Sequence, residues 1–153
     1  METGNNAINF SGQLDVFAVR HLIGWMRESC FLPLSELPQL TYNDELGFTD
    51  ILKVHQAALA LHVPSPMNAL PEEIVSYMYH EPLWANDVQF IWETWSMDNQ
   101  QAYIVDKMIR FTAWHIVHSK DYGTDEDAIL AYVSEQPALA ERFYKDRSPH
   151  WFL

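Results

Sequence analysis

Cysteine is almost absent from this chain of 153 residues, because Cys30 is the only one. A single cysteine excludes an intramolecular disulfide and a cysteine-rich zinc site, and it is typical of proteins in a reducing compartment. We therefore expect a cytoplasmic protein. Cys30 falls on the apolar arc of a predicted helix, which indicates a small core residue rather than a reactive thiol.

Glycine is also scarce, with five residues, and none of them stands in a Gly-x-Gly or Gly-x-x-x-x-Gly-Lys context. The sequence therefore lacks a standard phosphate-binding loop. It also lacks Gly-x-Ser-x-Gly, His-Glu-x-x-His and Glu-x-x-His, the patterns of a hydrolase nucleophile, a zinc protease and a di-iron bundle. We assign no catalytic residue and do not expect an enzyme.

Long hydrophobic runs are missing as well. No segment contains the 18 or so apolar residues that a membrane helix needs, and the first residues, METGNNAINF, do not resemble a signal peptide. Neither membrane insertion nor export is expected.

Positive charge is sparse, with nine Lys and Arg against 21 acids and a formal net charge of −12. No Lys or Arg occurs between Lys53 and Lys107. Such a negative field disfavours direct nucleic-acid binding and attracts a basic protein partner, although acidity can also serve solubility alone. The acidic residues predicted to bind the partner are Glu72, Glu73, Glu81, Asp87, Glu93, Asp125, Glu126 and Asp127.

Helical periodicity covers most of the chain, and no segment alternates as a strand would. The prediction is an all-α fold, a compact irregular bundle of six or seven helices, in a single domain 1–153 whose first ten or so residues are frayed. The first expected helix, 11–30, is opened by Ser11 or Gly12, and the next is capped by Thr49. Another begins at Pro71 after a proline-rich connector, and a further one from about Asn86. A long central helix, 99–119, is followed by one opened by Thr124 and one from Pro137.

The central helix carries two contrasting faces. Asp98 is its predicted N-cap. The face predicted to lie in the core consists of Ala102, Val105, Met108, Ile109, Thr112, Ala113 and Ile116. The opposite face alternates cations with aromatic rings: Tyr103, Lys107, Arg110, Phe111, Trp114 and His118.

That second face has two interpretations. Neighbouring helices would cover it if the helix is central on all sides, with the cations extending to solvent. If it is exposed, Tyr103, Lys107, Arg110 and Trp114 form a binding stripe, because Tyr, Trp and Arg dominate interface hot spots.

Two histidines on the same helix suggest a metal site. His115 and His118 are three residues apart, close enough to share an ion with a ligand from elsewhere in the chain. Ordinary half-buried histidines would show the same spacing. No other cofactor is expected.

The sequence thus favours a small acidic protein that acts by protein–protein interaction on a basic partner, in the manner of an inhibitor, an immunity protein or a DNA mimic. One alternative is a metal- or cofactor-binding helical protein or enzyme that uses His115 and His118. Another is a structural oligomerisation module, with a homodimer formed through the central stripe or the aromatic tail SPHWFL.

Overall fold

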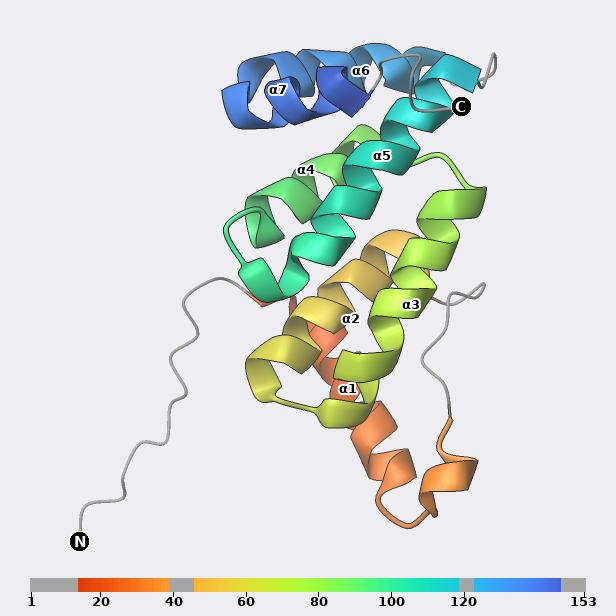
Figure 1. Cartoon of the computed structure of the whole chain (residues 1–153). Helices are drawn as coiled ribbons and strands as arrows, with labels where there is room; N and C mark the ends of the chain where they lie inside the picture. Colours follow the sequence, from red (N-terminus) through yellow and green to blue (C-terminus); the bar gives the residue numbers. More distant parts are fainter. Residues whose placement is uncertain (1–13, 39–45, 119–122, 147–153) are drawn as a thin grey trace, which may run out of the picture. The chain divides into compact units, whose positions relative to one another are not determined.

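The computed structural model describes residues 14–38, 46–118 and 123–146, and in these ranges the chain forms seven α-helices, two short 3-10 helices and no strand (Figure 1). The prediction of an all-α fold with six or seven helices is confirmed. The residues group into two compact units, 1–70 and 71–153. A single domain stays a prediction, and each unit is described by itself.

The first unit contains α1 (Val16–Ser29), η1 (Leu34–Glu36), α2 (Phe48–Leu61) and the beginning of α3 (Pro64–His80). α1 begins after Asp15, whose Oδ1 accepts a hydrogen bond from Ala18 N at 2.9 Å. The predicted caps, Ser11 and Gly12, lie outside the described residues. Cys30 follows the last residue of α1 and is exposed, so the prediction of a buried thiol was wrong.

α2 supplies much of the core of the first unit. It begins one residue after Gly47 rather than at Thr49, and Asp50 Oδ2 accepts a hydrogen bond from Gly47 N at 3.2 Å. Asp50 thus caps the helix from inside its first turn, and Phe48, the first residue of the helix, is buried. The fully buried hydrophobic residues of α2 are Ile51, Leu52, Val54, Ala57 and Ala58.

α3 differs most from the expectation. A connector was predicted up to Pro71, but one continuous helix begins at Pro64 and contains Pro71. Proline is tolerated in the first turn of a helix, where the backbone N–H groups have no intrahelical partner, so Pro64 and Pro66 begin the helix rather than preventing it. The division between the two units falls inside α3, between Leu70 and Pro71.

The second unit holds the end of α3, then α4 (Ala85–Trp95), η2 (Asn99–Gln101), α5 (Ala102–His118), α6 (Gly123–Glu135) and α7 (Pro137–Asp146). α5 contacts α4 and α7, and α6 contacts the same two helices. Side chains that are fully buried in this unit include Ile74, Met78, Ile91, Met108, Ile109, Ile129, Val133, Leu139 and Phe143.

The predicted central helix begins as a 3-10 turn. Asp98 caps it as expected, with Oδ1 accepting from Gln100 N at 2.9 Å. Of the predicted core face, only Ala102 is wrong: it is exposed at the junction of η2 and α5, while Gln101 is buried. Ile104 and His115 widen the buried face beyond the prediction.

None of the helices in the described part of the chain combines the length and the apolar composition that crossing a membrane requires.

Candidate protein-binding surface

The outward face of α5 carries a row of contacting side chains four residues apart. Tyr103, Lys107 and Phe111 follow one another along the helix, and Lys107 Nζ lies 5.4 Å from the Tyr103 ring centroid and 5.7 Å from that of Phe111. These distances suit cation–π attraction, which holds the ammonium group between the two rings. Tyr103 remains 57% exposed. This face of α5 is therefore ordered by its own contacts and is open to solvent.

α3 extends this row on to a second helix. The Tyr79 ring meets Phe111 edge-on at 5.5 Å and meets His80 edge-on at 4.9 Å. Tyr79 is 61% exposed. Sequence reasoning missed it, although the sequence held a signal: Tyr79 lies off the arc of Ile74 and Met78, which predicts a large ring on the outside of α3.

Trp114 continues the exposed aromatic side chains one turn further along α5. Its ring stacks on His118 at 4.7 Å with an interplanar angle of 14°, and it meets His115 edge-on at 5.1 Å. The Trp114 side chain is 42% exposed. Tyr79, Tyr103, Phe111 and Trp114 are called the aromatic face below.

Arg110, the fourth predicted member of the binding stripe, is engaged with acids rather than rings. Its Nε lies 3.4 Å from Asp106 Oδ2, and Asp106 Oδ1 lies 3.8 Å from Arg142 Nη2 of α7. Such exposed ion pairs are worth only about 0–1 kcal/mol each. Asp106 therefore lowers the positive charge on this side of α5 and links α5 to α7.

The histidine pair of α5 makes backbone contacts. His115 is buried, and its Nε2 donates to Met78 O of α3 at 3.1 Å. His118 Nδ1 donates to Trp114 O at 3.0 Å. The nitrogen that donates in each contact cannot bind a metal ion at the same time, so each histidine could bind one only through its other ring nitrogen. Within the described ranges, no three His, Cys, Asp or Glu side chains come together as a metal site.

The acidic residues predicted to bind a partner divide into two groups. Glu72, Glu81, Glu93 and Asp127 are exposed, and Glu73 and Glu126 are partly exposed.

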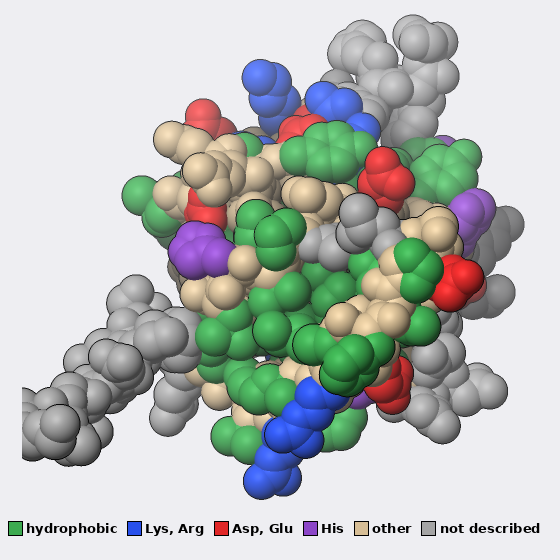
Figure 2. Space-filling model, turned by 90° about the horizontal axis from the view of Figure 1, so that it is seen from below, with side chains coloured by type: hydrophobic (Ala, Val, Ile, Leu, Met, Phe, Trp, Pro, Cys, Tyr) green, Lys and Arg blue, Asp and Glu red, His purple; other side chains and the backbone are tan. Residues whose placement is uncertain are grey.

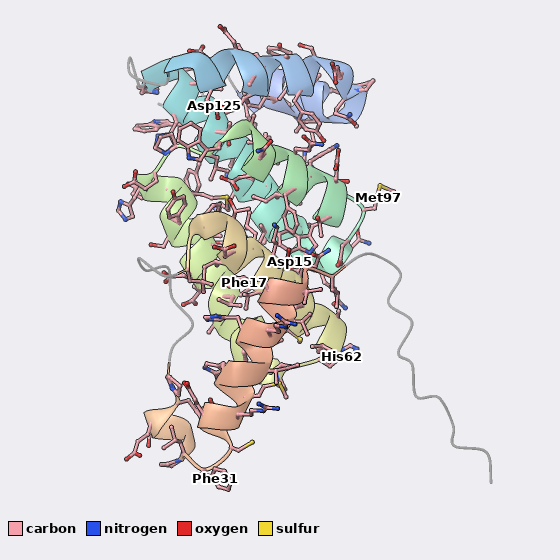
Figure 3. The ribbon with its side chains drawn as sticks, turned by 180° about the vertical axis from the view of Figure 1, so that it is seen from behind. Asp15, Phe17, Phe31, His62, Met97 and Asp125 are labelled. Carbon is pink, nitrogen blue, oxygen red and sulfur yellow. The ribbon has the colours of Figure 1, made fainter. Side chains whose placement is uncertain are left out.

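Asp87 and Asp125 have other environments. Asp87 is only 2% exposed in the first turn of α4, so its predicted place on the surface is wrong. A carboxylate is stabilised there by the helix dipole. Asp125 Oδ2 accepts a hydrogen bond from Ala85 N at 2.7 Å and thereby caps α4 from α6. Figure 3 labels Asp125 at its helix.

Glu93 of α4 contacts the side chains of two other residues. It accepts hydrogen bonds from Gln89 Nε2 at 3.0 Å and from the Tyr132 hydroxyl at 3.3 Å. Burial, followed by the negative charge of Glu93, raises the pKa of Tyr132 to about 12. A phenol that stays protonated can keep donating to the carboxylate, which ties α6 to α4.

The chain matches no protein-family model, and comparison with curated proteins and with solved structures gave no match.

Proposed function

We propose that this protein is a non-enzymatic binding protein whose residues 71–153 dock a basic protein partner through the aromatic face. The observation that carries the proposal is the set of large rings on α3 and α5, with Tyr79 in contact with Phe111 and with Tyr79, Tyr103 and Trp114 exposed. Tyr and Trp are enriched in interface hot spots because they bury a large area at a small cost in conformational entropy.

The distribution of charge supports a basic partner. Residues 71–153 contain 14 acids and six cations, so this unit carries a formal charge of −8. Glu81 follows directly after His80, the residue that contacts Tyr79, and its side chain is exposed. Negative charge around an apolar contact surface raises the association rate of a basic protein, and salt weakens this attraction.

The two cations of the stripe do not oppose this arrangement strongly. Lys107 lies against the rings of Tyr103 and Phe111, and Arg110 is paired with Asp106. Both charges are therefore balanced in part by neighbours on α5. Inhibition of an enzyme, immunity to a toxin and mimicry of DNA are the classes of action that suit such a surface.

The test is capture of a partner from an extract of the source cells by immobilised protein, at low and then at high salt. Wild-type protein is compared with Trp114→Ala and with Trp84→Ala, because Trp84 is 64% exposed and lies outside the aromatic face. We expect a basic protein to bind wild type and Trp84→Ala at low salt, to dissociate at high salt, and to bind Trp114→Ala at least tenfold more weakly, which is about 1.4 kcal/mol.

Circular dichroism of each variant controls for folding. The proposal would be contradicted if high salt did not release the partner, if Trp114→Ala retained the partner as well as wild type does, or if no basic protein were captured.

A further inference from the structure

α1 exposes hydrophobic side chains on the side that faces away from α2. Its inner face buries Ala18 and Leu22 completely. On the outer side, Val16 is 64% exposed, and Phe31, just after the helix, is 94% exposed. The remaining exposed hydrophobic residues of this segment are Phe17, Ile23, Met26 and Leu32. Apolar residues on both sides are unusual for a helix at the surface of a soluble domain, where the outer face is polar.

Two arginines stand within this exposed hydrophobic surface. Arg20 and Arg27 are both exposed, and at 100° per residue they fall within about 40° of Val16 around the helix. They are seven residues apart, or about 10.5 Å along the axis. Neither takes part in the ion pairs found among the described residues. Val16, Phe17, Arg20, Ile23, Met26, Arg27 and Phe31 are called the α1 face below.

The chain that follows α1 returns along another side of the helix. Trp25 Nε1 donates to Pro38 O at 2.6 Å, and Trp25 lies about 180° from Val16 around the helix axis. Among the described residues, the segment at Pro38 therefore lies on the side of α1 opposite Val16 and does not cover the α1 face. Figure 3 shows α1 from its outer side, with Phe17 near its start and Phe31 beyond its end, and Figure 2 shows Lys or Arg side chains projecting beside hydrophobic ones.

We infer that the α1 face is a second docking surface, which binds an acidic amphipathic helix of a protein partner. The complementary helix presents two carboxylates about two turns apart, set among apolar side chains, so that they meet Arg20 and Arg27 while the apolar residues cover Val16, Ile23 and Met26. This inference is independent of the aromatic face, which lies in the other unit and favours a partner of the opposite charge.

Electrostatic repulsion disfavours two other occupants of the α1 face, a second copy of this chain and an anionic membrane. In a two-fold pair of identical α1 faces, Arg20 and Arg27 of one copy meet the same arginines of the other, and like charges at such a contact repel. An anionic membrane would attract the arginines, but the chain as a whole carries a formal charge of −12 and is repelled by that surface. An acidic helix interacts locally with the two arginines and covers the hydrophobic side chains.

The probes that test this are two synthetic helical peptides with identical leucine positions. One carries Glu at two positions seven residues apart, and the other carries Lys at the same positions. Each is titrated by fluorescence anisotropy into the full chain, into the double variant Arg20→Glu/Arg27→Glu, and into Lys145→Glu, which reverses an exposed cation on α7.

We expect the full chain and Lys145→Glu to bind the Glu peptide about tenfold or more tightly than the Lys peptide, because each reversed charge pair adds repulsion. The double variant should prefer the Lys peptide. Equal binding of the two peptides, no binding of either, or an unchanged preference in the double variant would overturn the inference.

Two further measurements distinguish an acidic helix from a membrane and from a second copy of this chain as the occupant of the α1 face. Binding of the full chain to vesicles of phosphatidylglycerol and phosphatidylcholine without discrimination between the peptides would assign the α1 face to a membrane. A dimer in sedimentation that Ile23→Glu dissociates would assign it to a second copy. Either result would overturn the inference.

Discussion

At the scale of single residues, several acidic residues of this chain cap the starts of helices. Asp15, Asp98 and Asp125 each accept a hydrogen bond from a backbone N–H at the start of a helix. An aspartate in such a position satisfies a donor that has no partner within the helix. These carboxylates keep their negative charge, but an oxygen of each is already engaged by a backbone N–H.

The sequence predicted Asp98, missed Asp15 because it placed the start of that helix at Ser11 or Gly12, and missed Asp125 for a physical reason. Asp98 caps the helix that follows it in the chain, so spacing alone identifies it. Asp125 caps α4 from 40 residues away, and this contact depends on how α6 packs. A contact between elements leaves no periodic signal, and Asp125 was therefore read as a surface charge.

Tyr132 gives a residue-scale prediction. Its pKa is raised from the ordinary 10.0 to about 12, by burial first and by Glu93 second. The folded state therefore holds the proton more tightly than the unfolded state, so this contribution to stability is fully present below pH 10 and is lost as the pH rises towards 12. Tyr132→Phe should remove that part of the alkaline loss of stability.

Ultraviolet titration of tyrosinate measures the pKa directly, as the difference between wild type and Tyr132→Phe. In Glu93→Gln the pKa should fall below the wild-type value, while burial keeps it above 10.0. A Tyr132 that titrates at its ordinary value in wild type would contradict the contact with Glu93.

At the scale of elements, α3 shows how position decides the effect of proline. Pro64 occupies the first helical position, where a missing N–H costs nothing, whereas Pro71 lies inside the helix. Sequence reasoning placed a helix start at Pro71, because proline there is usually the first residue rather than an interior one. The continuous helix shows that packing of Leu70, Ile74 and Met78, all fully buried, outweighs the local penalty.

Pro71→Ala should therefore stabilise the protein, by about 1–3 kcal/mol, because alanine restores a backbone donor and removes the clash of the ring with the preceding turn. Thermal unfolding followed by circular dichroism measures the change. Pro64→Ala is the control, since Pro64 lacks no intrahelical bond and is exposed. Equal shifts in the two variants, or a lower melting temperature for Pro71→Ala, would show that the interior proline is not a strained position.

α5 shows how far periodicity can predict a surface. Its 3.6-residue period separated the buried face from Tyr103, Lys107 and Trp114, which the structure places at the surface or partly exposed. The period could not reveal that Tyr79 of α3 joins the same face, or that Arg110 turns to Asp106. Those contacts depend on which helices pack together and on side-chain conformation.

At the scale of the whole molecule, two surfaces of different character lie in different units. The aromatic face belongs to residues 71–153, where acids exceed cations by eight, and the α1 face belongs to residues 1–70, where the excess is four, and carries two arginines. This arrangement assigns the two proposed partners, which have opposite charge, to different units. It also explains why the net charge alone describes neither surface.

The central claim is that a partner binds over the aromatic face, and hydroxyl-radical footprinting of the captured complex tests it most directly. Tyr79, Tyr103 and Trp114 are exposed in the free protein and should become protected from oxidation in the complex, while Trp84 and Tyr144, which are also exposed, should react as before. Protection of Trp84 or Tyr144, with Tyr79, Tyr103 and Trp114 still oxidised, would place the partner elsewhere and contradict the account.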